Sequence, residues 1–255
     1  MKIALRLLGL LVLGVIALQL YFAACILAMR WLPAHSTAFQ RSEAWRITLA
    51  SGQLKWRQEW VPYAAISNTL KRAVIASEDA SFAEHDGVDL EALEKAWSKN
   101  QLAEQRAARL AEQAARRNAA KPAAVQPVAA RPAKVVGGST ITQQLAKNLF
   151  LSGERTLVRK GQELVLTFML EALLGKERIL EIYLNSVEWG EGVFGAEAAA
   201  RHYFRKSAAQ LSPYEAARLA VMLPRPRYFE KRPTSEYLMA RAQTIQARMG
   251  AVELP

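Results

Sequence analysis

Two adjacent carboxylates stand out in the stretch SEDASFAEHDG (Ser77–Gly87), which directly follows an apolar segment typical of a buried helix. If that helix continued, Glu78, Phe82 and His85 would share one face, with Asp79 on the neighbouring face. Neighbouring carboxylates raise each other's pKa, and an apolar wall such as Phe82 raises the pKa of a nearby acid further. This arrangement tunes a carboxyl group to act as a general base or a general acid.

The same stretch also fits a solvated helix end. His85 would then lie near the last turn, where the helix dipole favours positive charge, and Gly87 would cap the carboxyl end. Spacing alone favours this second interpretation, so a catalytic role for the carboxylates depends on what accompanies them.

A glycine pair followed by polar side chains forms the second candidate, in the stretch GGSTITQQLAKNLF (137–150). Thr140 and Gln143 have the capping-box spacing that starts a helix, and a helix N-terminus after glycines can bind an anion through its free N–H groups. Capping alone is the plainer explanation. The dense polar run on an otherwise apolar helix favours a binding site, whose candidate members are Gly137, Gly138, Ser139, Thr140, Gln143, Gln144, Lys147 and Asn148.

Basic residues recur along one face of the next stretch, RTLVRKGQE. Arg155, Arg159 and Glu163 are spaced four apart, and Lys160 lies beside them. An ion pair between Arg159 and Glu163 is ordinary helix chemistry. Three cations for one acid exceed what that pair needs, and a diphosphate or a membrane surface would supply the missing negative charge.

A transmembrane anchor is predicted at the N-terminus. The segment Leu7–Met29 carries no charge, and at about 1.5 Å per residue it is long enough to cross a hydrocarbon core of about 30 Å. The apolar run continues past any small-residue cleavage site, and past the lipoprotein-like Cys25, so we expect an uncleaved anchor. Lys2 and Arg6 precede it, which predicts a cytoplasmic N-terminus by the positive-inside rule.

Composition limits the remaining possibilities. The 255 residues, half of them hydrophobic, suffice for one full domain and an accessory segment, and the single Cys rules out an internal disulfide. The net charge of +11 favours an anionic partner. The chain after the anchor is expected to lie outside the cytoplasm, where DNA is not an expected partner. The positive charge therefore favours lipid headgroups or a phosphorylated lipid.

The chain after the anchor divides by composition. A short hairpin is expected around Ser51–Gly52. The insert Lys99–Lys134 has eight Lys or Arg and two Glu, a net charge of +6. It begins as a strong helix former and ends as a Pro/Ala linker, so we expect it to face solvent or headgroups, although it could be a passive linker. Short helices follow, of which ELVLTFMLEALLG is expected to be the central buried one.

Five stretches in chain order carry a more specific signal: EDASFAEHDG, GGSTITQQLAKN, RTLVRKGQE, KERILEIYLN and WGEGVFGAEAAARHYF. They closely resemble the five motifs of the family 51 glycosyltransferases, the peptidoglycan transglycosylases. The stretch LSPYEAARLAVMLPRPRYF also looks like the family's closing helix. The resemblance covers the chain from about residue 60 to about residue 230.

The resemblance implies a mainly α fold, a lysozyme-like glycosyltransferase domain behind a single N-terminal transmembrane helix. We expect a cytoplasmic tip and anchor over 1–30, a membrane-proximal segment over 31–65, and the glycosyltransferase domain over 66–250 with its basic Ala/Pro-rich insert at about 99–134. No Ser-x-x-Lys or Lys-Thr-Gly motif of a transpeptidase follows, so the chain looks like the monofunctional biosynthetic type.

The resemblance also implies a substrate, lipid II, which is a disaccharide-pentapeptide joined through a diphosphate to a polyprenyl chain. Glu78 would be the general base for inverting β1–4 bond formation, with release of polyprenyl diphosphate. Glu163 would be the second catalytic acid, positioning the donor site and its cations. Substrate and diphosphate binding would fall to Ser139, Gln143, Gln144, Lys147, Asn148, Arg155, Arg159 and Lys160, and motif support to Asp79, Phe82, His85, Gly87, Gly137, Gly138, Thr140 and Asn185.

No cofactor is required by the sequence, although Mg²⁺ or Mn²⁺ could accompany the diphosphate or be held by Asp79. Expected partners are lipid II, the nascent glycan strand, membrane lipids, and proteins of cell-wall synthesis or division; nucleic acid is not expected. The expected location is the bacterial cytoplasmic (inner) membrane, crossed once, with the catalytic domain in the periplasm. Two alternatives are a lytic glycan-cleaving enzyme of lysozyme-like fold and a non-catalytic cell-wall assembly scaffold. The basic face argues against the first, and the intact Glu78 and Glu163 argue against the second.

Overall fold

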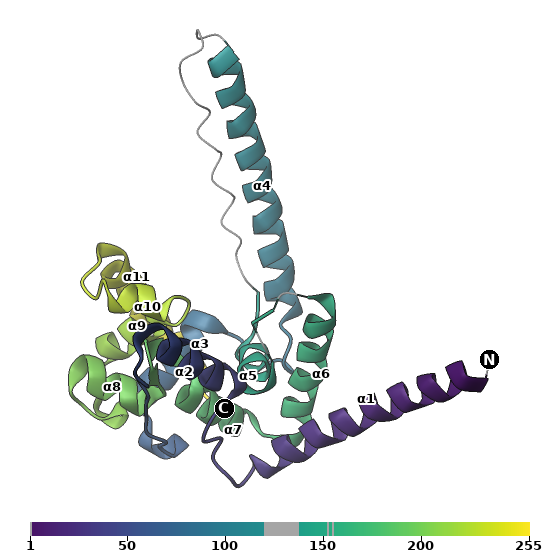
Figure 1. The fold of residues 1–255 in the computed structure, drawn as a ribbon. Coiled ribbons are helices and arrows are strands. Elements are labelled where there is room, and N and C mark those ends of the chain that lie inside the picture. Colours follow the sequence, from purple (N-terminus) through teal and green to yellow (C-terminus); the bar gives the residue numbers. More distant parts are fainter. Residues whose placement is uncertain (1, 120–137, 152, 155) are drawn as a thin grey trace. The chain divides into compact units, whose positions relative to one another are not determined.

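A computed structural model describes residues 2–119, 138–151, 153–154 and 156–255 (Figure 1). The chain forms two compact units, one of residues 1–88 and 140–255 and the other of residues 89–139. The first unit contains α1 (Lys2–Ala28), α2 (Ala38–Ser51), α3 (Asn68–Glu78), α5 (Ile141–Phe150), α6 (Leu157–Leu173), α7 (Lys176–Ser186), α8 (Ala196–Phe204), α9 (Pro213–Met222), α10 (Pro226–Glu230) and α11 (Glu236–Arg248). It also contains the strands β1 (Arg57–Gln58), β2 (Glu188–Gly190) and β3 (Val193–Phe194), and the 3₁₀ turns η1 (Tyr63–Ala65), η2 (Ala208–Gln210) and η3 (Met249–Ala251). The second unit is built on α4 (Leu90–Ala119), and the mainly α fold is as predicted.

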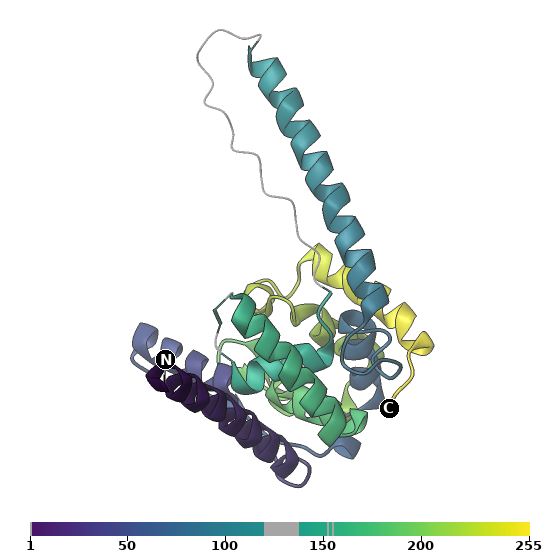
Figure 2. The same ribbon diagram turned by 90° about the vertical axis from the view of Figure 1, so that its right-hand side faces the viewer.

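The helix α1 has 27 residues, and an 18-residue stretch within it has a mean hydropathy of 2.5, so the helix is long and apolar enough to cross a membrane. Most of its side chains are exposed, and only its C-terminal end enters the core, where Ile26 is buried. There the Phe22 ring lies 5.1 Å from the Phe150 ring. The helix also contacts α6 (Figure 2), where the side-chain amides of Gln19 and Gln162 exchange two hydrogen bonds of 2.8 and 3.0 Å.

The segment predicted as a hairpin around Ser51–Gly52 is instead the end of a helix. Thr37 and Gln40 form a capping box that starts α2, and Gly52, with φ of +68°, ends it in the left-handed conformation. That conformation suits glycine at a helix end as well as in a hairpin turn. The following strand β1 pairs in parallel with the distant β3, so the hairpin prediction is wrong because local turn chemistry could not reveal a non-local partner.

The three short strands form one sheet in the order β1-β3-β2. β2 and β3 are antiparallel, with an irregularity between Glu188 and Gly190. Gly192, with φ of +74°, makes the connecting turn, and a Cβ there would lie 2.3 Å from the Lys55 carbonyl oxygen. The Gly192 carbonyl in turn accepts a hydrogen bond of 2.8 Å from the Arg57 N–H, which brings the membrane-proximal segment onto the sheet.

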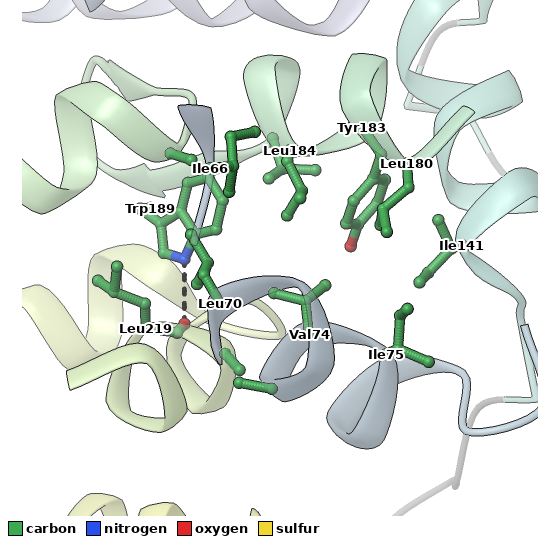
Figure 3. Packing of buried hydrophobic residues seen from close by; sticks show 14 of the residues in the cluster. Ile66, Leu70, Val74, Ile75, Ile141, Leu180, Tyr183, Leu184, Trp189 and Leu219 are labelled. Atoms are coloured by element: carbon green, nitrogen blue, oxygen red, sulfur yellow. Dashed lines mark hydrogen bonds between the residues drawn. The ribbon is translucent and has the colours of Figure 1, made fainter. Parts of the chain in front are cut away.

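The core of the first unit lies between α3, α7 and α9 (Figure 3). α7 is buried along its length from Ile179 to Ser186, and the Trp189 indole donates 3.0 Å to the Leu219 carbonyl across the core. The prediction that ELVLTFMLEALLG would be the central buried helix is wrong. On α6 only Glu163, Leu166, Thr167 and Leu170 are buried, whereas Phe168 is 51% exposed.

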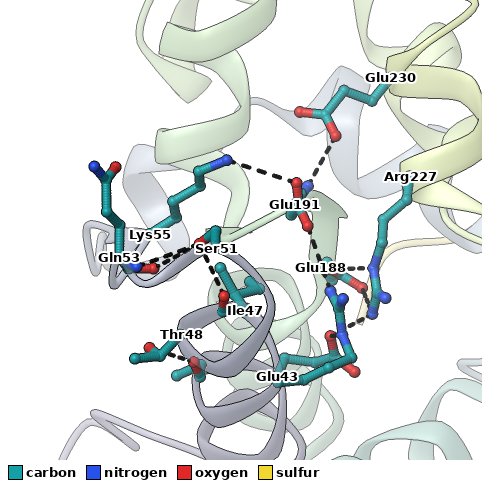
Figure 4. A network of polar contacts seen from close by, with 12 residues as sticks. Glu43, Ile47, Thr48, Ser51, Gln53, Lys55, Glu188, Glu191, Arg227 and Glu230 are labelled. Atoms are coloured by element: carbon teal, nitrogen blue, oxygen red, sulfur yellow. Dashed lines mark hydrogen bonds and ion pairs between the residues drawn. The ribbon is translucent and has the colours of Figure 1, made fainter.

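A polar network joins α2, β2 and α10 (Figure 4). Arg227 contacts Glu188 through two bonds of 3.0 and 3.2 Å and also pairs with Glu43. Glu43 binds Arg46 at 2.7 Å. Burial raises the pKa of Glu188, and Arg227 opposes the rise. The network fixes these three elements to one another around the sheet.

The second unit begins at Asp89, whose carboxylate accepts a 2.7 Å hydrogen bond from the Ala92 N–H at the start of α4. The helix-forming half of the predicted insert lies on α4 up to Ala119. Its Pro/Ala half lies outside the described residues. At the end of this unit Gly138 approaches α4 so closely that a Cβ would lie 3.3 Å from the Leu93 Cα.

Candidate active site

Helix α3 carries Glu78 out of the core. Ser67 starts the helix by accepting a 3.2 Å hydrogen bond from the Leu70 N–H. The helix ends at Glu78, because Asp79 has φ of −164° and donates its N–H to the Ile75 carbonyl at 2.9 Å. Glu78 is partly buried, so the solvated-end interpretation favoured by spacing alone does not describe it. The helix also does not continue as far as Phe82 or His85.

The Glu78 carboxylate accepts hydrogen bonds from two neighbours, Gln144 Nε2 at 3.1 Å and Ser77 Oγ at 3.4 Å. Burial raises the pKa of the Glu78 carboxyl above its ordinary value, and the negative charge of Asp79 acts in the same direction. The two hydrogen bonds and the positive charge of Arg241 oppose this rise in pKa. A carboxyl with a raised pKa is a stronger proton acceptor once ionised, as a general base requires.

Tyr183 on α7 fixes the orientation of Gln144. The tyrosine is fully buried and donates its hydroxyl to Gln144 Oε1 at 2.9 Å, which leaves the amide nitrogen to face Glu78. Burial raises the pKa of Tyr183 well above its ordinary value, and the charges of Glu78 and Asp79 add to this effect. The phenol therefore stays protonated and remains a donor.

The second carboxylate, Asp79, is held by two donors and has a different role from Glu78. Its Oδ1 lies 2.8 Å from His85 Nε2, and its Oδ2 accepts a 2.9 Å hydrogen bond from the Ile141 N–H at the start of α5. His85 Nδ1 accepts from the Gly87 N–H at 3.1 Å, so the imidazole proton lies on Nε2 and points at Asp79. Asp79 thus joins the loop after α3 to the N-terminus of α5, where negative charge is favoured.

A partly buried ion pair holds the same loop from the other side. Lys176 Nζ lies 2.8 Å from Glu171 Oε1 and 2.5 Å from the His85 carbonyl oxygen. It also lies 4.6 Å above the centre of the Phe82 ring. Thr142 donates its hydroxyl to the same Glu171 oxygen at 2.6 Å. We call Lys176, Glu171 and Thr142 the loop clamp, because they join α5, α6 and α7 to the segment 79–87.

Gly87 closes this loop. Its φ is +86°, and a Cβ there would lie 2.6 Å from Thr167 Cγ2 on α6. Its carbonyl accepts a 2.6 Å hydrogen bond from the Thr140 hydroxyl. A glycine is needed both for the backbone conformation and for the close approach to α6.

The second predicted acid, Glu163, is buried on α6 and paired with two cations. Arg159 Nη1 lies 2.7 Å from one carboxylate oxygen and Lys160 Nζ lies 2.5 Å from the other. The group keeps a net positive charge, and the buried Arg159 Nε has no hydrogen-bond partner among the described residues. Lys160 remains half exposed, so this group can still bind an anion.

The predicted binding residue Gln143 and the predicted support residue Asn185 both have partners within the fold. Gln143 forms the predicted capping box with Thr140. Asn185 is fully buried, donates to the Val61 and Glu181 carbonyls at 2.9 Å each, and accepts from the Val61 N–H at 2.9 Å. It fixes the segment before α3 to α7.

The other predicted residues lie on α5, in the second unit or outside the described residues. Lys147 is exposed and Asn148 is half-buried on α5. Gly138 and Ser139 belong to the second unit. Gly137 and Arg155 lie outside the described residues.

The structure therefore brings Glu78, Gln144, Asp79, His85, Gly87 and Thr140 into one hydrogen-bonded group. Sequence reasoning missed Tyr183, Glu171, Lys176 and Arg241 as neighbours of this group. Tyr183 and Lys176 lie in the quoted stretch KERILEIYLN, which offered a signal for them. Nothing in the sequence marked Glu171 or Arg241.

A metal ion held by side chains does not fit the residues that the structure describes. Among them, no group of three or more His, Cys, Asp or Glu side chains could hold one. Asp79, the candidate ligand, already accepts hydrogen bonds at both oxygens.

Comparison with known proteins identifies the family of the chain. The model of the transglycosylase family matches residues 47–122 and 111–250 of the chain. A biosynthetic peptidoglycan transglycosylase of Burkholderia thailandensis is 52% identical over 240 residues, which cover 94% of this chain and 83% of that protein. Proteins of the same name from Burkholderia pseudomallei and Paraburkholderia xenovorans are 51% and 47% identical over 94% of this chain, and the matches cover 83% and 88% of those proteins. The chain therefore belongs to the transglycosylase family.

Proposed function

We propose that the chain is a peptidoglycan glycosyltransferase that polymerises lipid II into linear glycan strands, with Glu78 as its general base. The observation that carries this assignment is the chain of contacts Tyr183–Gln144–Glu78, which presents a carboxylate of raised pKa at the end of a buried helix. Family membership and the names of the relatives support the same activity.

In the proposed reaction Glu78 accepts the proton of the acceptor sugar's 4-hydroxyl. The hydroxyl oxygen attacks the anomeric carbon of the donor strand while the bond from that carbon to the diphosphate oxygen breaks. Polyprenyl diphosphate leaves from the α face, so the new β1–4 bond forms with inversion. Gln144, held by Tyr183, keeps the carboxylate in one orientation during this transfer.

The cationic group on α6 is proposed to meet the diphosphate. Lys160 is half exposed, and Arg159 has an unused buried Nε, so both can turn donors toward phosphate oxygens as the leaving group gains charge. Glu163 holds these cations in place rather than accepting the substrate proton. Because both Asp79 oxygens accept hydrogen bonds, any Mg²⁺ or Mn²⁺ that takes part would be bound through the diphosphate.

Helix α1 is compatible with a single-pass membrane anchor. We further propose that its N-terminus is cytoplasmic and that the remainder of the chain lies on the periplasmic side of the inner membrane, where proteins of cell-wall synthesis or division could bind it. Lys2 and Arg6 before the span support this orientation. Protease added to spheroplasts should spare a tag fused before Lys2 and digest one fused after Pro255; the reverse pattern would contradict the orientation.

Replacing Glu78 tests the catalytic assignment. General-base catalysis contributes about 10²–10⁴-fold, so Glu78→Gln should lower the rate of lipid II polymerisation by at least about 10²-fold. The measurement is glycan strand length and yield from purified lipid II, resolved by size.

Glu84→Gln is the matched control, because Glu84 is an exposed acid on the same loop and its loss should leave the rate within about twofold. Strand synthesis by Glu78→Gln at the wild-type rate would contradict the proposal. If the wild type cleaved glycan strands and did not synthesise them, the lytic alternative would be indicated. If it acted on neither lipid II nor glycan strands, the non-catalytic scaffold would be indicated.

A further inference from the structure

Two cavities lie along the strand segment WRQEW (56–60), outside the group around Glu78. One has a volume of about 360 Å³ and is lined by residues 56–59, Ala198, Arg201 and His202. The other has a volume of about 190 Å³ and is lined by His35, Trp56, Gln58 and Trp60. Trp56 and Gln58 belong to both linings, so the two cavities adjoin, and we call them together the β1 groove.

The two indoles of the β1 groove are held in place by the fold. The Trp56 ring lies 5.1 Å from the Phe194 ring of β3, and the Arg178 guanidinium lies 5.4 Å from the Trp60 ring. Both side chains are partly buried, whereas Trp31 and Trp45 are 70% and 68% exposed. Exposed tryptophans suit a membrane interface, while rings fixed in a cavity wall suit stacking on a ligand.

Positive charge lines the wider cavity. Arg57 Nη1 lies 3.0 Å from His202 Nδ1, and because a guanidinium only donates, that ring nitrogen accepts. Arg57 has no acidic partner among the described residues. Arg201 lies 3.4 Å from Glu59 and 2.8 Å from Glu197. Arg57 is therefore the cation that can take a carboxylate from a ligand.

The groove is fixed to the helix that supports the active site. Gln58 Nε2 donates 3.0 Å to the Asn185 carbonyl, and Asn185 exchanges two hydrogen bonds with the backbone of Val61. Two residues before Asn185 on α7, Tyr183 holds Gln144 against Glu78. A ligand in the β1 groove would thus be held at a fixed position relative to Glu78.

We propose that the β1 groove is an accessory binding site for the peptidoglycan strand. The apolar faces of successive pyranose rings stack on Trp56 and Trp60, and Gln58 Oε1 and His35 meet sugar hydroxyls. Arg57 binds a carboxylate of the stem peptide. Pocket walls of aromatic rings with a few placed polar groups are the usual form of a small-ligand site. This choice of ligand rests on the proposed function, in which the product of the enzyme is a peptidoglycan strand.

Binding of strands without a diphosphate tests the site, because such strands lack the group that the cations of α6 would recognise. Uncrosslinked glycan strands, with and without stem peptides, are titrated against the full-length protein in detergent, and the dissociation constant is measured. The double variant Trp56→Phe/Trp60→Phe should weaken binding of both strands by about tenfold. Arg57→Gln should weaken only the strand that carries peptides, and it avoids any change to packed rings.

Trp45→Phe is the control, because Trp45 is exposed and lines neither cavity. Equal strand binding by wild type, control and groove variants would overturn the proposal. So would loss of binding to anionic vesicles by the groove variants with strand binding intact, since that result assigns the tryptophans to the membrane. Lipid II polymerisation by the wild type is measured in parallel: its absence contradicts the proposed function, whereas its presence without groove-dependent strand binding contradicts only the accessory site.

Discussion

Glu78 acquires its chemistry from neighbours on other elements. The residue itself lies at the end of α3, but its hydrogen-bond partner comes from α5, that partner's support comes from α7, and an opposing positive charge comes from α11. The adjacent Asp79 has the same carboxylate group, yet its two oxygens accept hydrogen bonds from His85 and from the Ile141 N–H. The two neighbouring carboxylates therefore differ in their surroundings: burial raises the pKa of Glu78, while Asp79 joins the loop after α3 to the start of α5.

The raised pKa of Glu78 predicts a dependence of stability on pH. The folded protein binds this proton more tightly than the unfolded chain, so ionising Glu78 destabilises the fold as pH rises from about 4.3 through the raised pKa. Glu78→Gln removes this titration, so the variant should unfold at a higher temperature than the wild type at pH 8. Below about pH 4 both forms carry a neutral side chain and the difference should shrink. Thermal unfolding across this range checks it, and Glu84→Gln should show no such trend.

The loop clamp makes Lys176 a positioning residue. Lys176→Met removes the donor to the His85 carbonyl and to Glu171, so the segment beginning at Asp79 should shift. Misplacement by about 1 Å costs about 10²-fold, and we expect kcat for lipid II polymerisation to fall by that order with a smaller change in KM. Lys176→Arg should recover part of the rate.

Two further variants separate positioning from stability. Lys176→Met/Glu171→Gln leaves no unpaired buried charge, so it should regain thermal stability relative to Lys176→Met while kcat stays low. If the double variant recovered kcat together with stability, the loop clamp would contribute to stability and not to positioning. Lys206→Met, which breaks the pair between Lys206 and Glu215 away from the loop, should keep the wild-type kcat.

At the scale of elements, the sequence predicts α6 as the central buried helix, but the structure places α7 in that position. The part of α6 from Glu163 onward is apolar on nearly every face, yet one of its apolar faces is exposed, with Val165 and Phe168 exposed to 42% and 51%. α7 contains charged residues and is nonetheless the buried helix, because Glu181 pairs with Arg178 at 2.7 Å. An apolar composition shows only that a segment avoids water. Both a protein core and a membrane exclude water, so composition alone does not show that a helix is buried in the core.

The helix α4 is little buried where its side chains are described, with Ala96 the one buried residue among them. Its described side chains beyond Asn100 are exposed or half-buried, Leu102 and Leu110 among them. Residues 89–139 form a compact unit separate from the one that holds Glu78. The basic insert is thus an addition to the catalytic unit, and we propose that it faces solvent or lipid headgroups.

Shortening the insert should therefore leave catalysis intact. Deletion of Glu104 to Arg131 removes exposed helix and none of the hydrogen-bonded group around Glu78, and shortening a connection changes its closure free energy by only about 1 kcal/mol. We expect the rate of lipid II polymerisation in detergent to stay within about threefold of the wild-type rate. Loss of strand synthesis in a variant that still unfolds cooperatively would show that the insert takes part in the reaction.

At the scale of the whole molecule, helix α1, which is compatible with a membrane anchor, is joined to later helices of the same unit by specific contacts. Arg178 on α7 donates to the carbonyls of Met29 and Leu32 just after α1, at 2.8 Å each. Upstream, Gln19 and Gln162 pair α1 with α6. Since Gln162 neighbours Glu163, the anchor is held beside the helix that carries the cationic group, as a substrate with a membrane-embedded tail requires.

Much of this could be predicted from the sequence because it is local. The anchor follows from an uncharged apolar run, and the start of α5 follows from Thr140 and Gln143. The order of five short stretches indicated the family. The hairpin and the central helix were predicted wrongly, because β1 pairs with a strand more than a hundred residues away and α6 turns an apolar face outward.

The sequence by itself determined which residue types are present, where α1 can cross a membrane, and that Glu78 and Asp79 are neighbours. Only the tertiary structure decided how the surroundings of the two carboxylates differ. Burial raises the pKa of Glu78 and two donors hold it, while His85 and the N-terminus of α5 occupy Asp79. The same holds for the β1 groove, whose walls come from residues 35, 56–60 and 198–202. Hydrogen bonds and desolvation depend on which distant segments meet, and that information is carried by packing rather than by local spacing.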